Sequence, residues 1–176
     1  MRTTIFYLIG LVVVLSDQLS KWAVLRTIPY THPPTSVPVI AKVLALTHTH
    51  NTGGAFSLFQ ARNEWFEIVA VVAIVALVFA YHRMKSKSLA VTAALALAFG
   101  GAIGNLIDRI RFHEVVDFFD VLVPLPQIGR WPVFNVADSA ISIGIVLLAW
   151  HFLLSKEHQR QPATHVEPSP EPESTG

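Results

Sequence analysis

Four long runs of apolar residues dominate the chain, and most polar residues lie between them. The runs cover about residues 4–25, 65–82, 89–107 and 136–154. A helix needs roughly 17–25 apolar residues to cross the hydrocarbon layer of a bilayer, and each run is long enough to do so. A soluble helical bundle would need a polar face along each helix, and these runs lack one. The pattern therefore predicts four membrane-spanning helices.

The composition indicates the same class. Only 14% of the 176 residues are charged and 52% are hydrophobic, whereas a soluble domain carries about 25% charged residues. Neither the net charge of +1 nor any basic run points to nucleic acid. The lack of cysteine excludes disulfides, thiol nucleophiles and cysteine metal sites. We expect an all-α membrane protein with one domain, residues 1–160, and a disordered, Pro- and Glu-rich tail, residues 161–176.

Basic residues predict how the helices are oriented, because short cytoplasmic loops are enriched in lysine and arginine. They occur in the short link between the second and third runs, before the first run and after the fourth: Arg83, Lys85, Lys87, Arg2, Lys156 and Arg160. Both termini are thus expected in the cytoplasm, with outer loops at 26–64 and 108–135. The first run also resembles a secretory signal peptide, but no small-residue cleavage site follows it, so a retained helix is expected.

The first outer loop has the pattern of a small β element. Residues 37–46 are rich in β-branched side chains, and residues 47–50 alternate threonine with histidine before a glycine turn. We therefore expect a strand-and-turn element on the outer surface, between the first and second helices. His48 and His50 would share one face of a strand, but no third ligand has suitable spacing. No metal site is predicted from this pattern.

Two aspartates lie where a membrane protein tolerates charge poorly. Asp117 has two valines before it and two phenylalanines after it, and Asp138 begins the fourth apolar run. A carboxylate near hydrocarbon costs several kcal/mol unless it is paired or neutralised. Two carboxylates brought together can share one proton, which is the chemistry of aspartic proteases. Both positions map to the outer end of the bundle, so we expect them to meet there.

The two aspartates have unequal surroundings. Asn135 is placed to cap the fourth helix, with Asp138 in its first turn, and the positive helix end favours ionised Asp138. Completing that cap is an alternative role for Asp138. Asp117 should be partly desolvated, which raises its pKa and favours the neutral acid. We therefore expect Asp138 to act as the base and Asp117 as the acid.

Other polar residues interrupt the apolar runs. Asn105 can share a helix face with Asp108 and Arg109, and Arg109 alone would be explained as an interfacial anchor. Asp17 and Lys21 stand four residues apart with the acid first, which is the favourable order for an ion pair within one helix. We expect this pair to have a structural role, because either charge alone would be costly in lipid.

Four sequence blocks together give the chain a recognisable pattern. In order, they are Asp17-Gln18-Leu19-Ser20-Lys21, Asn51-Thr52-Gly53-Gly54-Ala55-Phe56, Gly104-Asn105-Leu106-Ile107-Asp108-Arg109 through Val116-Asp117-Phe118, and Phe134-Asn135-Val136-Ala137-Asp138. In this order, on a four-helix plan covering about residues 5–155, the chain resembles the lipoprotein signal peptidases (signal peptidase II). These are bacterial inner-membrane aspartic endopeptidases.

The resemblance implies a specific reaction. The family removes the signal peptide from prolipoproteins, cutting before a cysteine that already carries a diacylglyceryl group, and globomycin inhibits it. The resemblance makes Asp117 and Asp138 the catalytic dyad on the extracytoplasmic face. Residues that would position the dyad or substrate are Asn51, Gly53, Asn105, Asp108, Arg109 and Asn135, with Asp17 and Lys21 as structural support. It implies no metal or organic cofactor, no nucleic-acid partner, contact with membrane lipid, and a monomer.

A transporter is the alternative from another functional class, because acids and amides inside a membrane also mark proton and ion pathways. That interpretation predicts acids spread through the depth of the membrane. Here the notable acids gather at one end, and Lys21 can neutralise Asp17. The sequence also lacks the HExxH and GxSxG patterns of zinc and serine hydrolases. The aspartic peptidase is therefore favoured.

Overall fold

The structure is a computed structural model, and it describes residues 1–52, 63–84, 88–123 and 130–160. Within these residues it contains four helices, α1 (Arg2–Thr27), α2 (Asn63–Arg83), α3 (Leu89–Phe112) and α4 (Val136–Arg160). All four are long and apolar enough to cross a membrane. The four-helix prediction is confirmed.

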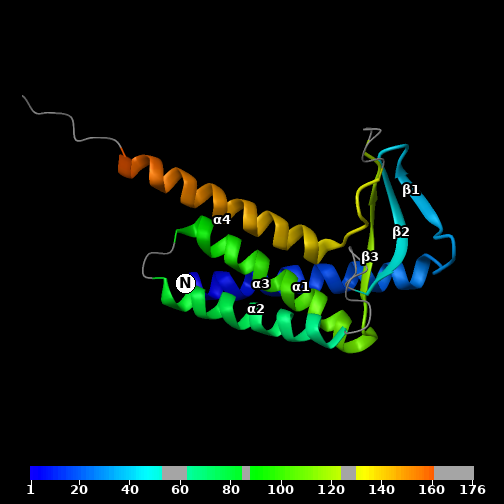
Figure 1. Cartoon of the computed structure of the whole chain (residues 1–176), viewed down its shortest axis with the longest axis horizontal. Coiled ribbons are helices and arrows are strands. Elements are labelled where there is room, and N and C mark those ends of the chain that lie inside the picture. Colours follow the sequence, from blue (N-terminus) through cyan, green and yellow to red (C-terminus); the bar gives the residue numbers. More distant parts are fainter. Residues whose placement is uncertain (53–62, 85–87, 124–129, 161–176) are drawn as a thin grey trace, which may run out of the picture.

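The third helix is the centre of the bundle, with the other helices packed around it (Figure 1). More than half of its most apolar stretch (56%) is buried, against 6% for α2. Small residues allow this packing: a Cβ on Gly100 would lie 2.7 Å from the carbonyl oxygen of Gly10, and one on Gly101 would collide with that of Ala137. Close backbone approach through small residues is typical of helices packed in membranes.

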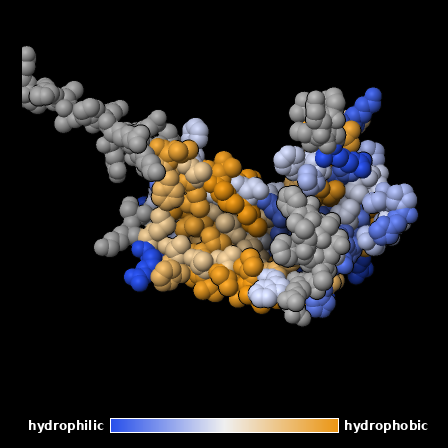
Figure 2. Space-filling model, in the orientation of Figure 1, coloured by the Kyte–Doolittle hydropathy of each residue, from blue (hydrophilic) through white to orange (hydrophobic). Residues whose placement is uncertain are grey.

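The surface separates into two parts along the long axis of the molecule. Figure 2 shows a broad hydrophobic band over the helices and a hydrophilic region at the end that carries the strands. Many large apolar side chains on the helices are exposed. Leu19, Val72 and Leu153, for example, have exposed fractions of 61–64%. Such an extended apolar surface fits contact with lipid rather than water.

A three-stranded antiparallel sheet lies at one end of the bundle (Figure 1). Its strands are β1 (Ser36–Ile40), β2 (Leu44–Asn51) and β3 (Val115–Val121), with β2 in the middle. The predicted β element between the first two helices is present as β1 and β2. The prediction was incomplete, because the second outer loop supplies β3. Its nearly continuous burial obscured the alternation that identifies a strand.

The sheet is fixed to the bundle through β3. Val116 and Phe118 pack against Val24 and Ile28 at the end of α1, forming a buried apolar cluster. The helix α3 also continues to Phe112, five residues beyond the predicted end at 107. The residues Asp108 and Arg109 therefore lie on the last turns of a helix, close to the start of β3.

Candidate active site

The two aspartates predicted to meet are brought together by pairing between β3 and the segment before α4. The backbone N–H of Phe119 donates to the carbonyl of Phe134 at 2.7 Å, and the N–H of Phe134 donates back to Phe119 at 3.1 Å. Asp117 lies two residues before Phe119 in β3, and Asp138 lies four residues after Phe134 in α4. The pairing thus places Asp117, near the middle of β3, beside the first turn of α4.

The N-terminus of α4 is capped as the sequence predicted. The Oδ1 atom of Asn135 accepts a hydrogen bond from the N–H of Asp138 at 2.9 Å, and Oδ2 of Asp138 accepts one from the N–H of Asn135 at 3.3 Å. This reciprocal arrangement is a capping box with an aspartate in the last position. The cap fixes the Asp138 side chain at the positive end of the helix.

Three asparagine side chains hold the two carboxylates. Asn135 donates through Nδ2 to Oδ1 of Asp117 at 2.7 Å, so the residue that caps Asp138 also binds Asp117. Asn51 donates to the other oxygen of Asp117 at 2.9 Å, and Asn105 donates to Oδ1 of Asp138 at 2.8 Å. Amide donors fix the carboxylate orientations without adding charge. The predicted residues Asn51, Asn105 and Asn135 therefore all lie at the pair.

The Asp117 carboxyl differs electrostatically from a surface carboxyl. Burial, and then the charge of Asp138, raises its pKa from 3.8 to about 7, although the hydrogen bonds from Asn51 and Asn135 act in the opposite direction. Desolvation and a neighbouring like charge both disfavour the ionised form. Near neutral pH, a substantial fraction of the Asp117 side chains is therefore protonated. Asp117 can therefore carry a proton beside a second carboxyl group, that of Asp138.

A buried lysine stands behind this pair. The Nζ atom of Lys21 lies 2.8 Å from Asp17, 2.9 Å from Asp108 and 3.0 Å from Oδ1 of Asn105. An ammonium group has three donors, and these contacts use all of them. The predicted Asp17–Lys21 pair is present, and Asp108 completes it from α3. Lys21 therefore also fixes the amide that binds Asp138.

The two carboxylates on Lys21 each hold a further element. Asp17 accepts from the backbone N–H of Ala137 in α4 at 3.0 Å, and Asp108 accepts from that of Val116 in β3 at 3.1 Å. The elements that carry Asp117 and Asp138 are thus tied to one buried ion cluster. Such a cluster contributes geometry more than stability, because desolvating its charges offsets most of their attraction.

Arg109 lies at the edge of the site. Its Nη1 atom donates to the carbonyl of Asn105 at 3.4 Å, and its guanidinium lies 5.9 Å from the ring centre of Phe66. The charges of Asp138 and Asp117 attract it. Arg109 is therefore near the pair without a direct hydrogen bond to it. The predicted site residue Gly53 lies outside the described residues.

A cavity of about 540 Å³ opens beside Asp138. One wall is the first two turns of α4, with Ser139, Ser142 and Ile143, and another is the apolar segment 131–134 before that helix. Asn51 also lines it. A mostly apolar cavity with a few convergent polar groups is the usual form of a ligand site.

Comparison with known proteins decides the family. The family model described as signal peptidase (SPase) II matches residues 9–154. The chain belongs to the signal peptidase II family. A lipoprotein signal peptidase of Moorella thermoacetica is 40% identical over 158 residues, covering 89% of this chain and 99% of the relative. One from Geobacter metallireducens is 37% identical, covering 88% and 94%.

A solved structure shows the same fold. A bacterial membrane enzyme determined by the in meso method at 2.3 Å resolution superposes with a TM-score of 0.79 at 31% identity, covering 91% of this chain and 93% of the other. The protein is thus a multi-pass membrane peptidase of the signal peptidase II type. The transporter interpretation is not supported.

Two residues that lie at the candidate site were missed by the sequence reasoning. Gln18 donates through Nε2 to Oδ1 of Asp108 at 3.0 Å and to the carbonyl of Gly104 at 3.2 Å. Gly104 lies against Asp17, and a Cβ there would come within 2.6 Å of its Oδ2 atom. Both residues stood inside the quoted blocks, but a glutamine or glycine in a helix gives no chemical signal of its own.

Proposed function

We propose that Asp117 and Asp138 form the catalytic dyad of an aspartic endopeptidase that removes signal peptides from diacylglyceryl-modified prolipoproteins. The main support is the shared contact with Asn135, which binds one carboxyl through its side chain and the other through its backbone. Membership of the signal peptidase II family supports the substrate class. The cut would fall before the lipid-bearing cysteine.

The proposed reaction begins with a water molecule between the two carboxyl groups. Ionised Asp138 takes a proton from the water, whose oxygen attacks the scissile carbonyl carbon, while Asp117 donates its proton to the carbonyl oxygen. The tetrahedral intermediate collapses with cleavage of its C–N bond as the peptide nitrogen accepts the proton that Asp138 took from water, and a hydroxyl group of the intermediate returns a proton to Asp117. The products are a signal peptide with a new carboxyl end and a lipoprotein whose first residue is the lipidated cysteine. The single proton belongs to the pair, as in other carboxylate dyads.

The supporting residues would keep the pair aligned during this reaction. Asn51 and Asn135 orient Asp117, and Asn105 orients Asp138. The ion cluster of Lys21, Asp17 and Asp108 fixes the elements that carry them. Arg109 would interact with the negative charge of the two aspartates from the edge of the site. We also propose that Gly53 contributes as the family pattern implies.

The cavity beside Asp138 is suited to the proposed substrate. Its apolar wall can receive the hydrophobic end of a signal peptide, and the exposed apolar helices keep the enzyme in the bilayer with the lipid-modified cysteine. We place the site at the extracytoplasmic face, with both termini in the cytoplasm, and we expect the enzyme to act as a monomer. A reporter fused after Lys85 that proved extracytoplasmic would overturn this orientation.

Cleavage by purified variants tests the dyad. Wild type, Asp117→Asn and Asp138→Asn are reconstituted with a diacylglyceryl-modified prolipoprotein, and cleavage is followed by the shift in product mass. Each variant should lose about 10²–10⁴-fold or more in rate, as expected when a positioned acid or base is removed.

Asp120→Asn is the matched control for this experiment. Asp120 is another buried aspartate of β3, bound to Thr47 and Arg130 rather than to the dyad. It should retain cleavage. A folded Asp117→Asn or Asp138→Asn variant with a wild-type rate would refute the proposal, and the thermal unfolding of each variant shows whether it is folded.

A further inference from the structure

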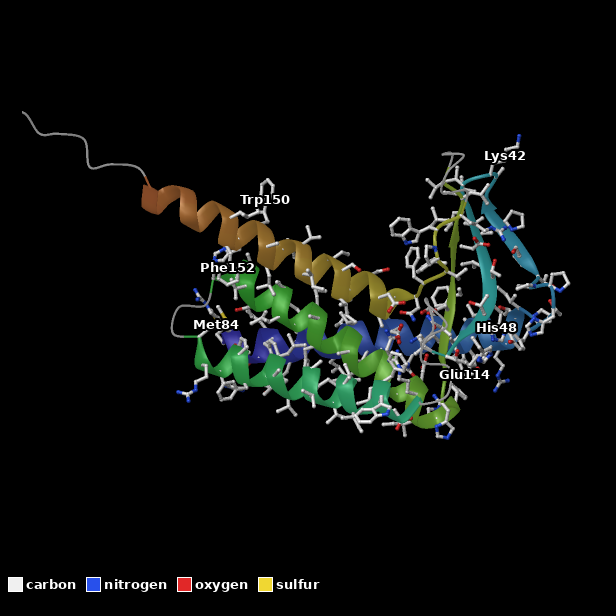
Figure 3. All side chains as sticks on the ribbon, in the orientation of Figure 1. Lys42, His48, Met84, Glu114, Trp150 and Phe152 are labelled. Atoms are coloured by element: carbon white, nitrogen blue, oxygen red, sulfur yellow. The ribbon has the colours of Figure 1, made fainter. Side chains whose placement is uncertain are left out.

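One face of α4 carries an ordered series of side chains that leads away from Asp138. Residues four apart lie on one ridge of a helix, about 6 Å apart along its axis. From Asp138 this ridge continues with Ser142, Val146 and Trp150. Val146 and Trp150 are each 64% exposed, and Figure 3 shows the labelled Trp150 pointing away from the other helices. A carboxyl group is thus followed by a hydroxyl group and then by apolar side chains along one membrane-spanning helix.

The cavity beside Asp138 includes the first part of this ridge. Ser142 and Ile143 line it, and Ile143 is itself 52% exposed. The cavity is therefore continuous with the apolar surface that α4 presents to lipid. Its volume of about 540 Å³ is that of a small-molecule site. It cannot enclose two acyl chains, since each chain of a lipid reaches about half-way across the roughly 30 Å hydrocarbon layer. A lipid-modified substrate can place only its polar linkage here.

The two hydroxyl groups on this wall of the cavity differ in their partners. Ser139 donates through Oγ to the carbonyl of Asn135 at 2.9 Å, a bond that a serine can make within its own helix. Ser142 makes no hydrogen bond to any residue that the structure describes, and it is exposed. A hydroxyl group in apolar surroundings is costly without a partner. Ser142 therefore has a donor left for a molecule that occupies the cavity.

We propose that Ser142 donates a hydrogen bond to an ester carbonyl of the diacylglyceryl group while the scissile bond lies at Asp138. This inference rests on the proposed function. An ester carbonyl only accepts hydrogen bonds, which matches the donor of Ser142. The glyceryl group separates the esters from the cysteine by several bonds, just as one helical turn separates Ser142 from Asp138. The acyl chains then continue along Val146 and Trp150 into the bilayer, and the other wall, residues 131–134, remains for the signal peptide.

Cleavage of two matched substrates tests this contact. One is the prolipoprotein with an ester-linked diacylglyceryl group, and the other carries an ether-linked dialkylglyceryl group, which has no carbonyl oxygens. Ser142→Ala should lower kcat/KM for the ester substrate by about two- to tenfold, as expected for the loss of one neutral hydrogen bond, and should leave kcat/KM for the ether substrate nearly unchanged. Ser142→Thr keeps the hydroxyl group and should retain the preference for the ester substrate.

Ser139→Ala is the matched control, because the hydroxyl group of Ser139 is already bound to the carbonyl of Asn135. It should leave the ratio of the two kcat/KM values as in wild type, whatever its effect on the rates themselves. The proposal is overturned if Ser142→Ala lowers both values equally, which would indicate a merely structural role, or if it changes neither value.

A binding measurement separates this inference from the proposed function. The full chain with Asp117→Asn, in lipid nanodiscs, should bind the ester-linked substrate without cutting it, as followed by the fluorescence anisotropy of a labelled substrate. Adding Ser142→Ala should weaken binding of the ester-linked substrate and not of the ether-linked one; equal binding of the two substrates before and after this change would overturn the role of Ser142. If wild type cuts neither substrate, the proposed function fails, and the binding ratio alone then decides the role of Ser142.

Discussion

Removing one hydrogen bond from Asp117 should move the alkaline limit of activity. The side chain of Asn51 donates to Oδ2 of Asp117 at 2.9 Å, and this bond favours the ionised carboxylate. Asn51→Ala deletes the donor while Asn135 still binds the other oxygen. The neutral acid is then favoured up to a higher pH. If Asp117 is the acid, cleavage should persist further into the alkaline range.

The size of this shift follows from the energy of the bond. A hydrogen bond to a charged group is worth about 1.5–3 kcal/mol, and one pKa unit corresponds to about 1.4 kcal/mol. The full effect would be about one to two units. Asn51 lies exposed at the end of β2, where water can replace it, so the lower value applies. The pKa that sets the alkaline limb should therefore rise from about 7 to about 8.

The assay is the pH dependence of kcat/KM, which reports the ionisations of the free enzyme. Cleavage of the lipid-modified prolipoprotein is measured at low substrate concentration for wild type, Asn51→Ala and Thr49→Val. Thr49 is the matched control because its hydroxyl donates to the backbone carbonyl of Asp117, not to the carboxyl. Thr49→Val should leave the limb in place.

Two results would refute this reasoning. An alkaline limb that does not move in Asn51→Ala would mean that it does not report Asp117. A shift of the acidic limb instead would show that the group with a pKa near 7 acts as the base, which reverses the proposed roles of the two aspartates.

Three further predictions concern stability, measured by thermal unfolding in detergent. Lys21→Met leaves two buried carboxylates unpaired and should lower the free energy of unfolding by about 3–5 kcal/mol. Adding Asp108→Asn to this variant should recover part of the loss. A Lys21→Met variant as stable as wild type would contradict the role of the cluster. Gly104→Ala places a Cβ 2.6 Å from Oδ2 of Asp17 and should cost about 1–3 kcal/mol; an unchanged midpoint would show that the helices can separate freely. The raised pKa of Asp117 means that the folded state binds its proton more tightly than the unfolded chain. Stability should therefore fall as pH rises from 3.8 to about 7. Asp117→Asn should remove that loss, and a difference from wild type that does not depend on pH would be inconsistent with it.

Much of the fold could be predicted from hydrophobic runs, because helices that face lipid must be apolar over a fixed length. The start of α4 was also predictable, since Asn135 and Asp138 form a local cap. The end of α3 was not, because Asp108 and Arg109 look like a membrane boundary by charge alone. The structure shows that the helix continues past Asp108, because the charge of Asp108 is paired with Lys21 on another helix.

The strand that carries Asp117 could not be predicted, for a related reason. β3 forms only because β2 and the segment before α4 supply its hydrogen bonds from distant parts of the chain. Asp117 and Asp138 could be expected to meet, and the resemblance placed Asn135 among the residues that position them, but its direct contact with Asp117 could not be assigned from the sequence. Asn135 was predicted as a cap, and its second contact depends on the sheet.

The ion cluster also has a consequence for biosynthesis, when the helices enter the bilayer one after another. Asp17 and Lys21 are one turn apart on the same helix and contact each other at 2.8 Å. The first span can therefore enter the membrane with its charges already matched, before the ribosome has produced any of its later partners. Asp108 arrives with the third span and Ala137 with the fourth. The same ion pair that helps the first helix to insert then supplies, through Asp17, the acceptor on which the last helix docks.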